Sequence, residues 1–428
     1  RLGLILVLVT AVGTVASPVL VGLMAPGFLD DPVRYGSTVS TLRWTFPYLF
    51  FISLVAMAAG ILNTHDRFGA AAATPILLNL SLITTVWLFV PDSQNGAVTL
   101  GIGVLVAGIV QLGFQFPFLK RLNRVPLPQV RARTPDDEVG AAGVGQVLKL
   151  MIPAIFGVSI AQINLLVNTI LASFLVTGSV SWLYYSDRLM EFPLGVFGVA
   201  LATVILPTLS RQVAESSEES YRKTLDWALR LVFLICLPAA AALAILAFPL
   251  MVALFQYGAF SGEDAGMASR ALAAFSIGLI GFVTVKVLAP GFYARKDTRT
   301  PVLIGAVAMG VNALVAVALV WDLAHVGLAL ATSAAGLVNA FLLYHRLSKL
   351  GHFSARAGWG LFLARVVVAT AAMSAFLYFT QGLQSEWLAA GLVERVGRLS
   401  LLIVSGALTY FGVLYATGLR VHQLLVRP

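Results

Sequence analysis

The sequence predicts an all-α polytopic membrane protein, and three observations lead to this prediction. Of the 428 residues, 59% are hydrophobic and only 11% are charged, with a mean hydropathy of +0.91. A soluble domain carries about 25% charged residues, so this chain lacks the polar groups to cover a surface that faces water. Its apolar residues form runs of about 20, the length that crosses a bilayer as a helix. No stretch alternates with the period of two that is typical of a barrel strand.

Windows of this length predict twelve membrane-spanning helices. In chain order they cover 2–24, 44–62, 72–90, 98–119, 146–172, 180–207, 227–250, 268–293, 301–321, 326–345, 360–380 and 398–419. One set of alternate loops, with the chain ends, carries 18 Lys and Arg, and the opposite loops carry 3. Since Lys and Arg are enriched in cytoplasmic loops, both ends of the chain are expected in the cytoplasm. The net charge of +9 then faces anionic lipid and does not indicate a nucleic-acid partner.

An internal repeat organises these spans. The segment 60–68 (GILNTHDRF) leads to Thr74-Pro75, and the segment 291–299 (GFYARKDTR) leads to Thr300-Pro301. Thr as N-cap with Pro at the first helical position also explains each Thr-Pro pair as ordinary helix punctuation. The two copies begin the third and ninth predicted spans, so they share one orientation, as parallel repeats do.

Six spans in each repeat predict four domains. They are 1–119, the four remaining spans of a first six-helix lobe; 120–145, a basic cytoplasmic linker; 146–346, a second six-helix lobe; and 347–428, a two-helix appendix. Because the first lobe retains only four of its six spans, two further spans are expected upstream. The chain also begins at Arg1 without an initiator methionine and looks truncated.

The most unusual intramembrane charges lie in the segment 184–195. At helical spacing one face carries Tyr184, Arg188, Glu191, Gly195, Gly198 and Ala202, with Asp187 beside it. A charge in mid-bilayer costs about 2.5–3.5 kcal/mol and needs a cavity, a partner or a function. Arg188 can bind an anionic group, most plausibly phosphate, through its planar guanidinium. It can equally form a structural ion pair with Glu191 or Asp187.

The remaining polar residues predict no catalytic centre. The five histidines have no metal-ligand spacing, and the single cysteine, Cys236, excludes an internal disulfide. Lys286 is close enough to its helix end to reach the cytoplasmic interface. The intramembrane polar residues could coordinate Na⁺ or hydrogen bond between helices; they are Asn164, Asn168, Asn312 and Thr332.

At these residues the chain resembles a known family. The segment 184–207 (YYSDRLMEFPLGVFGVALATVILP) is similar to the signature of the MurJ (MviN) family of lipid II flippases. Further matches are 46–48 (FPY), 62–64 (LNT), 67–68 (RF), 254–258 (LFQYG) and 286–293 (KVLAPGFY). The resemblance covers essentially the whole chain. It implies the fold of the multidrug/oligosaccharidyl-lipid/polysaccharide exporter superfamily, with two six-helix lobes and two C-terminal helices.

The resemblance also implies a function. It implies translocation of lipid II, an undecaprenyl-pyrophosphate-linked peptidoglycan precursor, from the inner to the outer leaflet of the bacterial cytoplasmic membrane by alternating access. One arginine that the family requires matches Arg188, and we expect Asp187 and Glu191 to join it in substrate binding. The other required arginines lie on helices that this chain does not contain.

The expected partners and cofactors follow from the same resemblance. We expect lipid II and membrane lipids as partners, no nucleic acid, contact with the cell-wall synthesis machinery and a monomeric protein. No cofactor is expected except Na⁺, which some members bind, and Asn168, Asn312 and Thr332 fall near those positions. Ala316 stands where a carboxylate would have helped.

Three other functions fit the composition. One is an exporter of drugs or of another polyprenyl-linked oligosaccharide, although a cationic cavity would repel cationic drugs. The second is an intramembrane enzyme acting on polyprenyl phosphates, for which only Asp187 and Glu191 could supply acid–base chemistry. The third is a scaffold for cell-wall synthesis, which would not need Arg188.

Overall fold

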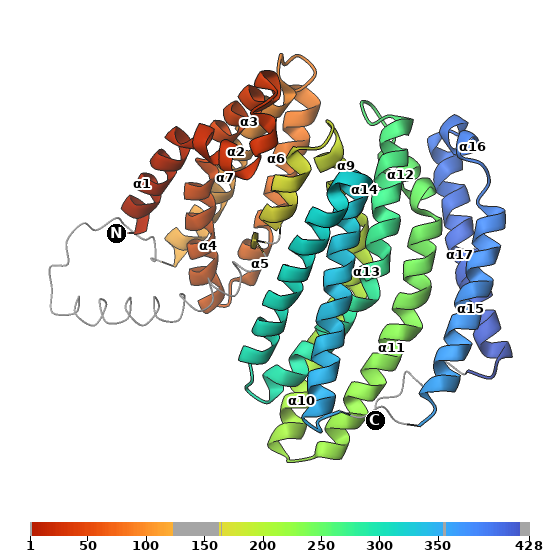
Figure 1. Ribbon diagram of the computed structural model, residues 1–428. Coiled ribbons are helices and arrows are strands. Elements are labelled where there is room, and N and C mark those ends of the chain that lie inside the picture. Colours follow the sequence, from red (N-terminus) through yellow and green to blue (C-terminus); the bar gives the residue numbers. More distant parts are fainter. Residues whose placement is uncertain (1, 123–161, 164, 354–356, 420–428) are drawn as a thin grey trace, which may run out of the picture. The chain divides into compact units, whose positions relative to one another are not determined.

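The chain forms two compact units, Arg1–Ala154 and Ile155–Pro428. The computed structural model describes residues 2–122, 162–163, 165–353 and 357–419. Every regular element within these residues is a helix (Figure 1), so the predicted all-α class is confirmed. The predicted linker 120–145 and the start of the predicted second lobe lie almost entirely outside the described residues, and these domain boundaries stay predictions.

The first unit is a bundle of short and bent helices. They are α1 (Leu2–Val15), α2 (Ser17–Met24), the 3₁₀ turn η1 (Pro26–Phe28), α3 (Pro32–Thr45), α4 (Tyr48–Thr64), α5 (Phe68–Ala72), α6 (Thr74–Leu88) and α7 (Gly96–Arg121). The α1–α2 pair bends by 70°. Residues 32–43, expected to form a loop, instead make α3, because Asp31 caps this helix by accepting from the backbone N–H groups of Val33 and Arg34 at 3.1 and 3.0 Å.

The predicted capping role of Thr74 is wrong. Its hydroxyl donates to the carbonyl of Ala71 at 2.8 Å, a group that lacks its usual helical donor because Pro75 has no N–H. It also accepts a bond from Gln115 at 2.9 Å. Gln111 donates to the Thr74 carbonyl at 3.0 Å, so two buried amides of α7 hold the break between α5 and α6. The proline supplies the break, and its neighbours supply the missing hydrogen bonds.

The second Thr-Pro pair is capped by another residue. The Asp297 carboxylate accepts from the Thr300 N–H at 3.0 Å. Hydrogen bonds from the Thr300 side chain and backbone lower the pKa of the Asp297 carboxyl. The predicted cap chemistry is therefore present at this helix start, but an aspartate three residues earlier provides it.

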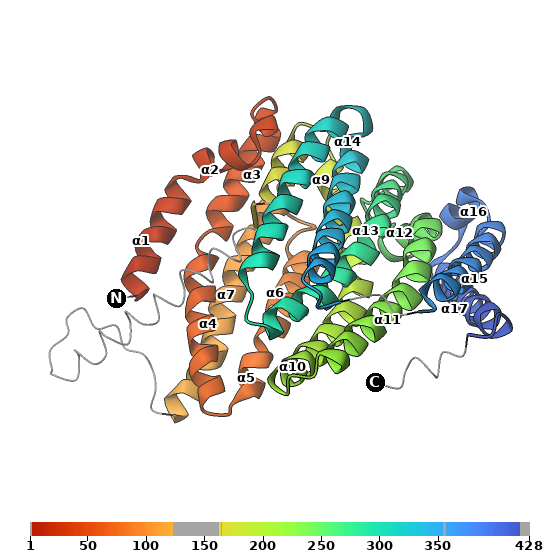
Figure 2. The ribbon, with the colours of Figure 1, turned by 60° about the horizontal axis from the view of Figure 1, so that its bottom comes forward.

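The second unit is a larger bundle. Its described helices are α9 (Ser179–Pro193), the π-helix η2 (Leu194–Val199), α10 (Ala200–Ala214), α11 (Glu218–Ile245), α12 (Ala247–Phe255), α13 (Gly262–Ala294), α14 (Arg299–Lys349), α15 (Trp359–Thr380), α16 (Gln384–Ala389) and α17 (Leu392–Ala416). α13 packs against α9, α10, α11, α12 and α14 (Figures 1 and 2). In its most apolar stretch 67% of the residues are buried, against 39% or less in each other described long apolar helix. α13 is therefore the core of this unit.

Small residues let α13 and α14 approach closely. A β-carbon on Gly281 would lie 2.6 Å from the carbonyl carbon of Gly336, and one on Gly278 would lie 2.7 Å from Ser333. The Ser333 hydroxyl also donates to the Ala274 carbonyl at 2.8 Å. Such contacts are typical of helix pairs in membranes, where packing and hydrogen bonds replace the hydrophobic effect.

α14 consists of two helices joined at Ala324, whose φ of 48° breaks the helix. Next to this break, His325 is buried and its Nε2 lies 2.9 Å from the Met267 carbonyl of α13. The predicted spans 301–321 and 326–345 correspond to the two parts. Each other predicted span overlaps one of the described helices, except 146–172, most of which lies outside the described residues.

The C-terminal helices are fixed to the rest of the second unit at three points. Trp359 donates to the buried carboxylate of Asp226 at 2.6 Å, and Arg230 holds the same carboxylate at 2.8 Å. Arg395 is buried and donates to three backbone carbonyls, two in the α16 region and one at Gln256. The Tyr410 hydroxyl donates to a carbonyl of α11 at 2.6 Å. These bonds connect residues far apart in sequence, so α15–α17 belong to this unit.

Gly281→Ala is expected to destabilise the second unit. The added methyl group would overlap the backbone of Gly336, which cannot move without shifting α14, so a loss of about 1–3 kcal/mol is expected. Gly266→Ala on the same helix is the control, because a β-carbon there has nothing within 4 Å. Thermal unfolding in detergent measures both. Equal melting temperatures for the two variants would contradict the close approach of α13 and α14.

Trp359→Phe is expected to loosen the C-terminal helices. The ring remains, but the N–H that donates to Asp226 is lost, and a hydrogen bond to a charged group contributes about 1.5–3 kcal/mol. Trp321→Phe is the matched control, since Trp321 is 70% exposed. The melting temperature in detergent should fall for the first variant and change little for the second. A larger fall for Trp321→Phe would argue against this attachment.

Candidate functional site

The candidate site lies on α9, which is amphipathic. Its buried side carries Trp182, Ser186 and Met190, which pack against α13. The Ser186 hydroxyl donates to the Ala268 carbonyl at 2.7 Å, and the Trp182 indole donates to Asp264 at 2.7 Å. Two hydrogen bonds to one neighbouring helix therefore fix the rotation of α9 about its axis. The opposite side of α9, which carries the predicted charges, is thereby held away from α13.

The three predicted site residues lie together on this opposite side. Arg188 forms an ion pair with Glu191 at 2.7 Å, and its other terminal nitrogen lies 3.8 Å from Asp187. The guanidinium carbon is 5.1 Å from the centre of the Tyr184 ring. The Arg188 side chain is 51% exposed and that of Glu191 is 47% exposed. The structure thus contains the ion pair that the sequence allowed and leaves half of the Arg188 side chain accessible.

The geometry of this cluster favours a binding role over a stabilising one. An ion pair this exposed contributes about 0–1 kcal/mol to folding, while a charge facing hydrocarbon is costly. An arginine whose side chain is half exposed on a membrane-spanning helix therefore needs water or a ligand beside its charged group. Glu191 occupies one terminal nitrogen, and the remaining N–H groups can donate to an anion.

After the cluster the chain passes from an α-helix into a π-helix. Pro193 is followed by the π-helix η2, a form that is rare and often found at functional sites. Gly195 is exposed, and a β-carbon at this position would have no atom within 4 Å. Gly198 is buried, and a β-carbon there would lie 3.6 Å from Cγ of Lys286. Lys286 itself is exposed. The sequence placed Lys286 in the span 268–293, near enough to its end to reach the cytoplasmic interface. The structure places it on the corresponding helix α13, and its contact with η2 is the feature that sequence reasoning did not expect.

The candidate cation ligands form a neutral hydrogen-bonded cluster. Asn168 donates to Thr332 at 3.1 Å and accepts from Asn312 at 3.1 Å. Oδ1 of Asn312 is buried and has no hydrogen-bond partner among the described residues, so it is the one oxygen free to face an ion. Ala316, also buried, offers none. Asn164 lies outside the described residues.

This donor set fits a hard cation only in part. Such ions favour several oxygens, commonly including a carboxylate, and the described residues contain no group of three or more His, Cys, Asp or Glu that could hold a metal. The three side chains already link their helices without an ion. The Na⁺ assignment stays a prediction.

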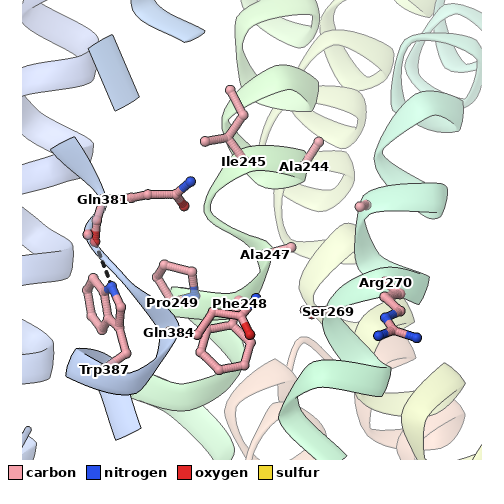
Figure 3. Close-up of a pocket in the computed structure, with 12 residues that line it drawn as sticks. Ala244, Ile245, Ala247, Phe248, Pro249, Ser269, Arg270, Gln381, Gln384 and Trp387 are labelled. Carbon is pink, nitrogen blue, oxygen red and sulfur yellow. Dashed lines mark hydrogen bonds between the residues drawn. The ribbon is translucent and has the colours of Figure 1, made fainter. Parts of the chain in front are cut away.

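A pocket that the sequence did not indicate lies between the α11–α12 joint, α13 and the α15–α16 connection (Figure 3). Its volume is about 240 Å³, and its polar lining includes Arg270, Gln381 and Gln384. The Trp387 indole donates to the Gln381 carbonyl at 2.7 Å and holds one wall in place. Three segments distant in sequence form the walls, so no local pattern could have revealed this pocket.

Comparison with known proteins gives the family. Residues 1–396 match the family model described as lipid II flippase MurJ. Over 432 aligned residues the chain is 40% identical to a probable lipid II flippase MurJ of Vibrio cholerae, covering 99% of this chain and 81% of the relative. It is 36% identical over 417 residues to the lipid II flippase MurJ of Burkholderia cenocepacia, covering 97% and 80%.

Solved structures agree in fold. A lipid II flippase MurJ in an inward closed conformation matches with a TM-score of 0.77 at 22% identity, covering 96% of this chain and 80% of that one. An inward-facing MATE family multidrug resistance transporter of the MOP superfamily matches with a TM-score of 0.66 at 16% identity, covering 82% and 79%. The chain therefore shares the helical fold of both structures. Since both the family model and the relatives span most of the sequence, the chain belongs to the MurJ family of lipid II flippases.

Proposed function

We infer that this chain is a lipid II flippase of the bacterial cytoplasmic membrane. The observation that carries this inference is the match to the family over residues 1–396, together with identities of 40% and 36% to two relatives over nearly the whole chain. The long apolar helices support a multi-span membrane location. The charge pattern of the loops supports cytoplasmic ends for this chain.

Moving lipid II is a problem of solvation. Its pyrophosphate and sugars cannot cross about 30 Å of hydrocarbon unaided, whereas its polyprenyl tail never has to leave the hydrocarbon. A transporter must therefore offer the headgroup a polar route and return it to water on the other side. No bond of the substrate needs to break, so the function requires binding groups and conformational change. Alternating access of two bundles would supply that route.

We propose that Arg188 binds the pyrophosphate of the substrate. Half of its side chain is accessible, and its pairing with Glu191 at 2.7 Å orients the guanidinium without using all of its donors. Asp187, on the other flank at 3.8 Å, limits how strongly a further anion is held. Competition between these carboxylates and the substrate would keep binding moderate, so that the headgroup can be released after it crosses.

Arg188→Ala is expected to lower lipid II flipping about 10- to 100-fold, because a hydrogen bond to a charged group contributes about 1.5–3 kcal/mol and each 1.4 kcal/mol is a factor of ten. The rate is measured in proteoliposomes with fluorescent lipid II. Arg188→Lys should retain part of the rate, since the charge remains without the planar pair of donors. Unchanged transport by the Ala variant would remove the phosphate-binding role.

Two controls separate binding from folding. Arg211→Ala removes an exposed cation at the end of α10 and should leave the flipping rate within about twofold. Glu191→Gln breaks the ion pair while leaving Arg188 in place, and should change the rate much less than Arg188→Ala. If Arg188→Ala and Glu191→Gln lowered the melting temperature and the flipping rate to the same extent, the ion pair would have a structural role only.

A further inference from the structure

A second cationic site lies in the first unit, at the predicted cytoplasmic ends of α4 and α7. A pocket of about 360 Å³ opens between the α4–α5 turn and the end of α7. Arg67 and Arg121 line it, together with Asp66, Phe68 and Phe118. A single water needs about 10–15 Å³ of such a cavity, so the pocket has space for a phosphate group and the atoms attached to it.

The pocket is built by a defined turn on an apolar base. Asp66 adopts a left-handed conformation, with φ of 57°, and the Arg67 N–H bonds back to the Leu62 carbonyl at 2.9 Å. This turn ends α4 and directs the chain into α5. Beneath it, Leu62 and Leu119 are buried in a cluster that joins α4, α5 and α7. Arg67 and Arg121 are therefore carried by elements that are packed together.

The same turn recurs in the second unit, where an arginine at a different position of the turn is paired. Lys296 has φ of 61°, and the Asp297 N–H bonds to the Phe292 carbonyl at 3.0 Å. There, Arg295 pairs with Glu218 at 2.6 Å and lies 4.4 Å from the centre of the Tyr221 ring. Arg295 precedes the left-handed residue of its turn and Arg67 follows the one in its own turn, so Arg295 only illustrates an arginine beside such a turn that has a protein partner.

The two arginines of the first pocket have no such partner. Within residues 2–122 and the other described ranges, neither Arg67 nor Arg121 forms an ion pair with a carboxylate, although Asp66 lines the same pocket. Both side chains are exposed, and Lys120 adds a further exposed cation next to Arg121. The pocket therefore carries an excess of positive charge that the described protein groups do not balance.

The pocket is lined by both cationic and aromatic side chains, a combination that suits a phosphate attached to an apolar group. Two guanidiniums offer planar paired donors to phosphate oxygens, and Phe68, 58% exposed, adds an apolar edge. The charge pattern places this end of the bundle at the cytoplasmic leaflet, where anionic headgroups attract Lys and Arg. A phosphate joined to an apolar tail satisfies both parts of the lining, whereas free phosphate uses only the cationic part.

We propose that Arg67 and Arg121 form a phosphate-binding site that holds the headgroup of an anionic phospholipid from the cytoplasmic leaflet. Phe68 lies against the lipid beside the bound headgroup. This site belongs to the first unit and is separate from the Arg188 cluster on α9. It does not depend on what the protein transports.

The test is a titration of the full chain in detergent with short-chain phosphatidylglycerol, followed by native mass spectrometry. Arg67→Gln with Arg121→Gln is expected to weaken binding about 10- to 100-fold. Arg211→Gln with Arg299→Gln is the matched control, because it removes the same charge from exposed arginines outside the pocket. That pair should change the dissociation constant by at most about twofold. Equal weakening by both pairs would overturn the site, since it would show attraction by net charge alone.

Two further arms separate the sources of phosphate and guard against misfolding. Inorganic phosphate should displace the lipid only at much higher concentration, and Phe68→Ser should weaken lipid binding while leaving phosphate binding unchanged. Phosphate binding as tight as that of the lipid would overturn the lipid assignment. Arg67→Lys with Arg121→Lys preserves the charge and should retain part of the affinity. Lipid binding that survives the double Gln substitution in a folded protein would refute the proposal.

Discussion

Hydrocarbon offers no hydrogen-bond partner, and this constraint accounts for the side chains found at two helix breaks among the described residues. A continuous helix satisfies its own backbone, so each break must be repaired by side chains. At Pro75 the freed carbonyl of Ala71 is taken by the Thr74 hydroxyl, and the amides of α7 surround the break. At Ala324 the neighbouring His325 reaches a carbonyl of α13. Buried polar residues, among them Thr74 and His325, thus lie beside both of these breaks.

The same constraint decides how arginines are accommodated. Arg395 is buried and surrounded by backbone carbonyls, and Arg230 shares the carboxylate of Asp226 with an indole. In these two places the protein supplies the partners, and the result is attachment between helices. Arg188 and the pair Arg67 and Arg121 differ, because part of each side chain remains open. Arginines that are paired with protein groups connect helices, whereas arginines with exposed side chains can bind a ligand.

Hydropathy and charge alternation predicted the helical class and nearly all of the described spans, because both depend on the local chain. They could not predict α3, whose start depends on the Asp31 cap, or the hydrogen bonds of Thr74, which depend on two residues of α7. For the candidate site, spacing alone grouped Tyr184, Arg188 and Glu191. It could not say whether the arginine would be paired, open or both. Lys286 and the pockets depend on contacts between distant segments, and no periodicity reveals those.

If Arg188 binds the substrate as we propose, its pairing and its exposure are compatible, because transport needs reversible binding. A guanidinium with no protein partner in a site with little water would hold a pyrophosphate too strongly to release it, and a fully paired one could not bind it. Glu191 at 2.7 Å and Asp187 at 3.8 Å place two competing acceptors beside the open donors. Rotation of α9 is restrained from behind by Ser186 and Trp182, so the cluster faces in one fixed direction. The two hydrogen bonds to α13 therefore fix the orientation of Arg188, while Glu191 and Asp187 limit its affinity for the pyrophosphate.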